Sequence, residues 1–232
     1  MDLLSIVFKG GWVMIPIALC SLIAVFIVVE RFLVLRKARL DVGQFMLKIR
    51  TIFRRGDIAA VLGFCSQKDA PIANILRKGL QKYDQGAEKV KDAIESAGKV
   101  EIYHLEKRIG LLATIAGIAP LIGFLGTVMG MIAAFRQIEG LGGNATPSDL
   151  AGGIWAALMT TAFGLIVGIL AYGFYNYFVS RVTRFVFEME SSSTELLELL
   201  QSQGSETSKS DDATVGEGKS YGAEGSFVRV RR

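Results

Sequence analysis

Hydrophobic residues along this chain gather in three long blocks. The blocks without a charged residue run from Gly10 to Val29, from Ile109 to Phe135 and from Leu150 to Ser180, over 20, 27 and 31 residues. A helix needs about 20 apolar residues to cross the hydrocarbon core of a bilayer. The pattern therefore predicts an all-α membrane protein with three transmembrane helices, at residues 10–35, 109–135 and 150–180.

The segments outside these blocks are amphipathic or polar. Residues 36–108 carry apolar residues at helical spacing, which predicts a cytoplasmic helical segment. One continuous helix is expected from about Ala87 to Phe135. The third helix is expected to continue through residues 181–200, so that the second and third transmembrane helices extend into a cytoplasmic helical bundle. Residues 201–232 are polar and rich in Gly and Ser, which predicts a disordered tail.

Basic residues are concentrated in one connecting segment. From Arg31 to Arg108 there are 17 Lys and Arg and 9 Asp and Glu, whereas residues 136–149 hold one Arg, one Glu and one Asp. Basic segments that flank spans stay in the cytoplasm. We therefore expect the N-terminal segment 1–9 and the loop 136–149 in the periplasm, and the C-terminus in the cytoplasm. This topology accounts for the net charge of +4, so nucleic acid is not an expected partner, whereas membrane lipid is.

The residues that usually carry catalysis or hold metals are scattered. Cys20 lies in the first block, Cys65 lies in the segment that follows, and His104 is the single histidine. A membrane enzyme would need clustered His, Asp or Cys near an interface, and a metal site needs several such ligands together. The sequence therefore argues against an enzyme and predicts no metal or other cofactor.

Small residues recur in the second and third blocks at intervals that suit helix packing. Lipid gives helices no hydrophobic reason to associate, so small residues that allow close backbone contact drive their packing. Packing alone explains most of these glycines: Gly123, Gly126, Gly130, Gly164 and Gly168. Pro120 lies in mid-span and predicts a kink, which is tolerated where a neighbouring helix satisfies the freed carbonyl.

Two threonines, Thr127 and Thr161, lie deep in the second and third blocks. A single membrane threonine commonly bonds back to its own helix. Two of them at comparable depth on neighbouring antiparallel helices indicate a shared polar stripe. A proton relay needs a titratable group, and neither block contains one. If the chain helps to move protons, the acid must come from another chain.

Two stretches, IAPLIGFLGTVMGMIAAF and GIWAALMTTAFGLIVG, resemble the signature helices of the MotA/TolQ/ExbB proton-channel family, and GGWVMIPIALCSLIAVFIVVERF is similar to its first span. The resemblance covers residues 10–200 and is closest to the three-span ExbB/TolQ branch. It implies a homopentamer around a central pore in the bacterial inner (cytoplasmic) membrane. A dimer of a single-span ExbD/TolR-like partner would lie in the pore and bring an essential Asp, and a TonB- or TolA-like force transducer would complete the system.

On this resemblance, Thr127 and Thr161 line the pore facing the partner's Asp. The chain would be the pore-forming stator subunit of a motor that uses the proton-motive force to energise TonB- or Tol-type force transfer to the outer membrane. Family members commonly show GI-x-E-A-L in the third helix, whereas GIWAAL places Ala156 at the pore-lining Glu position. This departure leaves a non-conducting membrane scaffold open as an alternative. A gliding or secretion motor stator of the same family is another.

Overall fold

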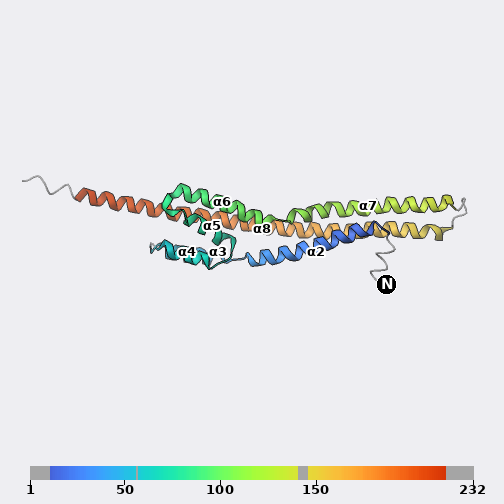
Figure 1. Cartoon of the computed structure of the whole chain (residues 1–232), viewed down its shortest axis with the longest axis horizontal. Coiled ribbons are helices and arrows are strands. Elements are labelled where there is room, and N and C mark those ends of the chain that lie inside the picture. Colours follow the sequence, from blue (N-terminus) through green and yellow to red (C-terminus); the bar gives the residue numbers. More distant parts are fainter. Residues whose placement is uncertain (1–10, 56, 141–145, 218–232) are drawn as a thin grey trace, which may run out of the picture. The chain divides into compact units, whose positions relative to one another are not determined.

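The computed structural model describes residues 11–55, 57–140 and 146–217 (Figure 1). Every regular element among these residues is helical: α2 (Met14–Lys37), α3 (Val42–Phe53), α4 (Ile58–Ser66), α5 (Pro71–Leu80), the short 3₁₀ helix η1 (Tyr83–Gln85), α6 (Ala87–Glu106), α7 (Ile109–Gly140) and α8 (Pro147–Glu217). Stretches long and apolar enough to cross a membrane occur within Met14–Phe53, Ala87–Gly140 and Leu150–Gln201. The prediction of an all-α protein with three spans is confirmed.

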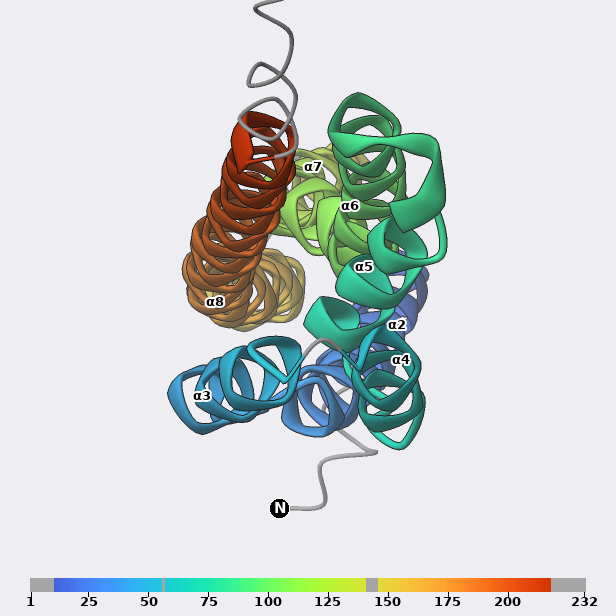
Figure 2. The ribbon, with the colours of Figure 1, turned by 90° about the vertical axis from the view of Figure 1, so that its left-hand side faces the viewer.

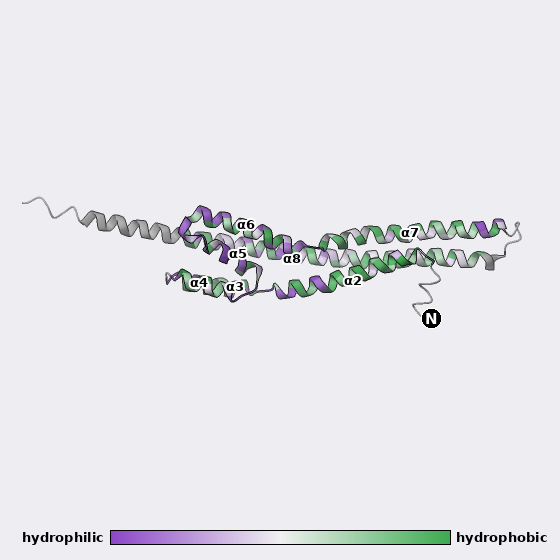
Figure 3. Ribbon diagram, viewed as in Figure 1, coloured by the Kyte–Doolittle hydropathy of each residue, from purple (hydrophilic) through white to green (hydrophobic). Residues whose placement is uncertain are grey.

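The chain divides into two compact units. The first, called here the membrane unit, comprises residues 11–39 and 99–187. The second, the helical unit, comprises residues 40–98 and 188–217, so that α6 and α8 contribute to both. Figure 3 shows apolar residues along α2, α7 and the first part of α8, and mostly polar residues along α6. The surface of the membrane unit therefore suits lipid, whereas the surface of the helical unit suits water.

The first span is the helix α2 of the membrane unit. A turn at Gly11, where φ is +74°, precedes the helix. Apolar side chains that include Ile17, Ala24 and Ile27 are buried, and α2 packs against α7. Arg36 and Lys37 occupy the last turn, where the negative end of the helix dipole favours cations. The N-terminal segment 1–9 lies outside the described residues.

The prediction of one helix from about Ala87 to Phe135 is wrong. α6 ends at Glu106, α7 begins at Ile109, and Arg108 between them has φ of +64°. A left-handed residue directly after a helix is a common way to end it. The guanidinium of Arg31 also donates to the carbonyls of His104 and Leu105, which occupies acceptors that a continuous helix would use. This contact is remote in sequence, so the pattern of residues 87–135 alone does not reveal the break.

α8 runs without interruption from Pro147 to Glu217. Proline suits the first position of a helix, because the N–H that it lacks would have no intrahelical partner there. The expected loop at 136–149 is shorter than predicted, because α7 continues to Gly140, and residues 141–145 lie outside the described part of the chain. Residues 201–217, which were expected to belong to a disordered tail, form the last part of α8. Extending an established helix avoids the cost of nucleating a new one. Residues 218–232 are not described.

The helical unit packs large apolar side chains between short helices. α4 packs against both α3 and α5, and Figure 2 shows α4 beside α5. The side chains of Asp41 and Asp57 cap the N-termini of α3 and α4 by accepting from the backbone N–H of Gln44 and Ala60. Beside small buried residues such as Ala73, this unit fully buries many large side chains: Ile49, Phe53, Val61, Ile75, Leu76, Leu80, Val90 and Leu196. Its core therefore resembles that of a water-soluble helical protein.

Candidate functional site

The contact between the antiparallel helices α7 and α8 is made by small residues that let the two backbones touch. A Cβ atom added to Gly123 would lie 2.9 Å from the carbonyl oxygen of Thr160 and 3.2 Å from the Cα of Gly164. One added to Gly130 would lie 2.7 Å from the Cβ of Ala157 and 3.0 Å from the carbonyl oxygen of Gly153. These spaces are too small for a methyl group, so glycine is required at both positions for this approach of the helices.

The same contact continues to Pro120 in mid-span. A Cβ on Gly164 would lie 2.7 Å from the carbonyl oxygen of Ala119, and a Cβ on Gly168 would lie 2.5 Å from the Cγ of Pro120. The proline ring thus occupies the space that glycine leaves at position 168. α7 remains one helix through Pro120, because tightly packed α8 supports the segment where the proline lacks a backbone donor.

Thr161 joins the two helices by a hydrogen bond. Its hydroxyl donates to the carbonyl oxygen of Gly123 at 2.9 Å, and the side chain is half-buried. Thr127 lies four residues after Gly123, on the same side of α7 and one turn away. The Thr127 hydroxyl donates at 2.6 Å to the carbonyl oxygen of Phe124 in its own helix. Both predicted threonines therefore lie along one edge of the α7–α8 pair, and both commit their protons to backbone carbonyls.

Ala156 does not share this edge. It precedes Thr161 by five residues, which places it about 140° around the axis of α8 at 100° per residue. Its side chain is half-buried. The structure thus brings Thr127 and Thr161 to one edge and leaves Ala156 on another.

Thr160 also belongs to the contact between α7 and α8. The sequence pattern did not predict a role for it. It is 1% exposed, and its hydroxyl donates to the carbonyl oxygen of Ala157 at 2.8 Å. A Cβ on Gly126 would lie 2.2 Å from the Thr160 hydroxyl oxygen. The Thr160 side chain therefore occupies the space that the absence of a side chain at Gly126 leaves. The neighbouring threonines divide their tasks: Thr160 packs the centre of the contact and Thr161 bridges its edge. Their adjacency was the available signal, but only the three-dimensional contact separates the two.

A cluster of charged residues stabilises the break between α6 and α7. The sequence pattern did not predict this cluster. Arg31 is 3% exposed, and its guanidinium donates to the carbonyl oxygens of His104 and Leu105 at 3.1 and 3.3 Å. The carboxylate of Glu30 pairs with both Arg31 and Arg108. A buried guanidinium is tolerated where acceptors face it, and these contacts supply acceptors to its two terminal nitrogens, whereas its Nε has no partner among the described residues. The Glu-Arg pair at the end of the first block was a visible signal, but it indicated only the end of a span.

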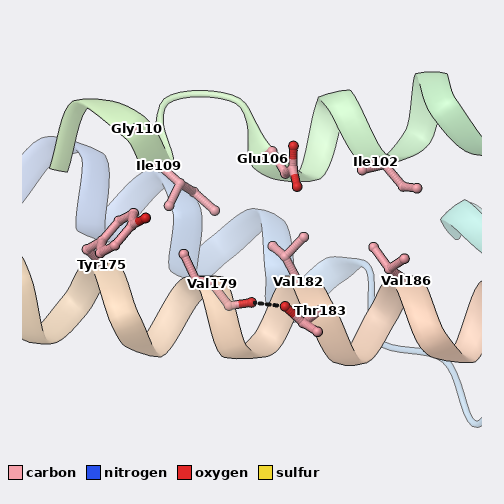
Figure 4. Close-up of a pocket in the computed structure, with 9 residues that line it drawn as sticks. All are labelled: Ile102, Glu106, Ile109, Gly110, Tyr175, Val179, Val182, Thr183 and Val186. Carbon is pink, nitrogen blue, oxygen red and sulfur yellow. Dashed lines mark hydrogen bonds between the residues drawn. The ribbon is translucent and has the colours of Figure 1, made fainter. Parts of the chain in front are cut away.

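A cavity of about 600 Å³ adjoins this break in the membrane unit. Figure 4 shows Ile109 and Glu106 facing Val179 and Val182 of α8 across it. Its lining is largely apolar, and Glu106 is the one charged side chain among the nine lining residues. A single carboxylate in an apolar cavity offers neither a metal site nor a catalytic pair. Within the described residues, no group of three or more His, Cys, Asp or Glu is placed to hold a metal ion.

The chemistry available along the α7–α8 edge is therefore hydrogen bonding and not acid–base catalysis. Residues 109–135 and 150–180 carry no Asp, Glu, Lys, Arg or His. A hydroxyl that donates its proton to a carbonyl still has lone pairs that accept. Such an edge can receive a hydrogen bond from a group that passes it, while holding no charge of its own.

Comparison with known proteins identifies the family. Residues 67–191 match the MotA/TolQ/ExbB proton channel family. The chain belongs to this family. The match includes α7 and the first part of α8, which form the contact described above. The resemblance noted from the sequence is therefore confirmed, and so is the expectation that the chain is not an enzyme, because this family consists of channel and stator subunits.

Two relatives support the ExbB side of the family. The chain is 31% identical over 175 residues to a putative biopolymer transport protein ExbB homologue of Methanothermobacter thermautotrophicus, a match that covers 75% of this chain and 62% of the relative. It is 30% identical over 177 residues to a putative ExbB-like biopolymer transport protein of Synechocystis, covering 75% of this chain and 84% of the relative. The chain thus spans less than two thirds of the first relative and most of the second.

A solved structure shares the fold. The structure of MotAB from C. jejuni aligns with a TM-score of 0.64 over 87% of this chain and 78% of that chain, at 15% sequence identity. At this identity the likeness concerns the fold alone. Family, relatives and apolar helices together identify a multi-pass inner-membrane protein.

Proposed function

We propose that this chain is the pore-forming stator subunit of a motor driven by the proton-motive force. The edge formed by Thr127 and Thr161 on two charge-free spans carries the proposal. A proton path across a membrane needs a titratable group. Because these spans supply none, the group comes from a partner, a single-span protein of the ExbD/TolR type with an essential Asp.

The threonine edge is suited to the neutral form of that Asp. Both hydroxyl protons are donated to carbonyl oxygens, so the hydroxyl oxygens are left as acceptors. A protonated carboxyl group is a donor, whereas an ionised carboxylate only accepts. The edge therefore favours the protonated Asp and gives the ionised one no donor. In this mechanism the Asp takes a proton from outside, moves along the threonines and releases it on the cytoplasmic side.

A ring of copies is supported by the exposed surface of the spans. Large apolar side chains on α7 and α8 are at least half exposed in the single chain, among them Leu121, Phe124, Trp155, Leu158 and Ile169. Neighbouring copies and lipid would cover them. We propose a homopentamer with a dimer of the partner in its pore, as in the resemblance. Two partner helices cannot make identical contacts with five copies of the chain at the same time. Each proton that binds and leaves therefore turns the pair of helices by one step relative to the ring.

The energy available suits such a step. One elementary charge that crosses 100 mV releases about 2.3 kcal/mol. A few protons therefore supply the energy of a modest conformational change. A TonB- or TolA-like transducer would carry the force to the outer membrane. We place the N-terminus in the periplasm and the C-terminus in the cytoplasm, because the basic segment between the first two spans favours the cytoplasmic side.

The proposal is tested by replacing both hydroxyls. The complex of the full chain with its co-purified partner is placed in liposomes, and proton flux is measured under an imposed potential. Thr127→Val with Thr161→Val should lower the flux at least tenfold, since valine keeps the shape and removes the acceptor. Thr114→Val is the matched control, because its hydroxyl also donates to its own helix, at 3.1 Å to Gly110, away from this edge. Equal flux in the double variant and the control would remove the threonines from the mechanism.

A non-conducting scaffold is the second candidate, and Ala156 favours it. Co-purification separates the two. A stator captures a small single-span partner with an Asp in its span, and changing that Asp to Asn abolishes the flux. A scaffold shows no flux with or without that Asp. Ala156→Glu, which introduces the carboxylate common in the family, tests whether this position limits conduction.

A further inference from the structure

A cavity of about 270 Å³ opens between the end of α2 and α8 in the membrane unit. Three arginines line it: Arg36 from the last turn of α2, Arg39 just after that helix, and Arg181 from α8. The other lining residues are apolar or aromatic, and none is acidic. Glu30, the acidic residue of α2, pairs with Arg31 and Arg108 instead. The cavity therefore concentrates positive charge without a carboxylate to balance it.

The remaining lining residues form an apolar floor and an aromatic rim. Leu35 and Phe178 are buried, at 5% and 0% exposed, and form the floor. Phe32 and Tyr177 are 49% and 40% exposed at the rim. The guanidinium of Arg181 lies 5.4 Å from the ring centre of Tyr177, a cation–π contact that holds it at the cavity. Charge is thus held against apolar surface, as in a site for an amphipathic ligand.

The cavity lies where two spans end. The charge-free blocks end at Val29 and Ser180; Arg181 follows the third block directly, and Arg36 and Arg39 lie about two to three helical turns after the first. This is the level of lipid headgroups, and basic pockets between transmembrane helices bind anionic headgroups. We propose that the cavity binds the phosphate headgroup of an anionic phospholipid. The proposal requires only that the spans lie in a membrane, and it does not depend on the motor function.

A phospholipid fits this surface better than a free phosphate. Below the arginines, α2 exposes apolar side chains toward the span, including Phe26, Val29 and Leu33, and α8 exposes Leu170 and Phe174. Acyl chains attached to the bound phosphate would follow these side chains. A free phosphate would gain only the arginine contacts. The occupant we infer is therefore a lipid such as phosphatidylglycerol.

Native mass spectrometry of the full-length protein in detergent tests the site. Phosphatidylglycerol or phosphatidylcholine is added, and bound lipid is counted. The wild type should retain phosphatidylglycerol in preference to phosphatidylcholine. Each Arg→Gln change at 36, 39 or 181 should weaken phosphatidylglycerol binding about fivefold, and all three together about a hundredfold.

The control removes the same charge elsewhere. Lys89→Gln, Lys91→Gln and Lys99→Gln alter exposed residues of α6, and this variant should bind lipid as the wild type does. The single arginine variants keep the test valid if the triple variant fails to fold, since their graded losses are measured on folded protein.

Several results would overturn the proposal. Equal retention of the two lipids by the wild type would do so, as would unchanged phosphatidylglycerol binding in the single and triple arginine variants. Displacement of the lipid by inorganic phosphate alone would make this a phosphate site. A smaller oligomer in the arginine variants with unchanged lipid preference would assign the cavity to a neighbouring copy of the chain.

Discussion

The α7–α8 contact and the core of the helical unit join helices by opposite means. In the contact, glycines at positions such as 123, 130 and 164 bring backbone against backbone. In the helical unit, large side chains such as Phe53, Ile49 and Leu76 fill the space between helices. Water drives the burial of large apolar side chains, whereas lipid does not distinguish a leucine in a contact from one facing the bilayer.

The difference shows that each unit is packed for its own solvent. The break between α6 and α7 lies at the end of the second span and uses a third means, a buried guanidinium that binds backbone carbonyls. Truncating a large buried side chain should therefore destabilise the helical unit most. Adding a methyl group to a glycine should destabilise the contact between α7 and α8. The following experiments test this contrast.

The largest effect is expected in the helical unit. Leu76→Ala should lower the free energy of unfolding by about 2–5 kcal/mol, because Leu76 is fully buried and its loss leaves a cavity. Leu47→Ala is the matched control, since Leu47 is 63% exposed, and it should change stability by less than about 0.5 kcal/mol. Denaturant unfolding of the full chain in detergent, followed by circular dichroism, measures both. Similar losses in the two variants would show that burial does not stabilise this unit.

The next effect is expected at the break. Arg31→Met should cost about 1.5–3 kcal/mol, because the carbonyls of His104 and Leu105 lose a charged donor. Arg31→Lys should recover part of this, since an ammonium keeps the charge but not the planar fork of donors. Arg55→Met alters an exposed arginine and serves as control. Hydrogen exchange of residues 103–110 gives a local readout, and unchanged protection in Arg31→Met would contradict the role of Arg31 at the break.

A smaller effect is expected in the span contact. Gly164→Ala should cost about 1–3 kcal/mol, because its Cβ would lie 2.7 Å from the carbonyl oxygen of Ala119 and 2.9 Å from the Cα of Gly123, and backbone atoms cannot rotate away. Gly117→Ala meets nothing within 4 Å and should be neutral or stabilise α7 by up to about 1 kcal/mol. Unfolding by sodium dodecyl sulfate in mixed micelles compares them. If both alanines stabilise, the close contact of α7 and α8 is not required.

The last effect is absent at neutral pH and appears only at alkaline pH. Burial raises the pKa of the Cys65 thiol from 9.0 to about 11. The unfolded chain therefore releases this proton near pH 9.0, while the folded chain keeps it, so the contribution to stability is complete below pH 9.0 and is lost as the pH rises toward about 11. In a Cys20→Ala background, Cys65→Ala should remove this part of the alkaline loss. The measurement is the difference in unfolding free energy between the two proteins across this range, and a flat difference would contradict the raised pKa.

Much of the fold could be predicted from residue patterns. Three charge-free blocks predict three spans, because the length of a helix that crosses a bilayer is set by the thickness of the hydrocarbon core. The threonines and glycines of the candidate site were also visible, since polar and small residues stand out in an apolar helix. The end of α7 at Gly140 and the helical residues 201–217 were not predicted, because a helix that is already nucleated extends at little cost beyond the apolar pattern that predicts it.

The sequence by itself determined which segments are apolar enough for lipid and that the second and third spans carry no acid or base. Only the tertiary structure decided that Thr160 packs while Thr161 bridges, and that Arg31 ends α6 from 73 residues away. The reason is physical: solvent preference belongs to each residue and its neighbours in sequence, whereas a contact depends on which backbone from elsewhere in the chain comes within reach.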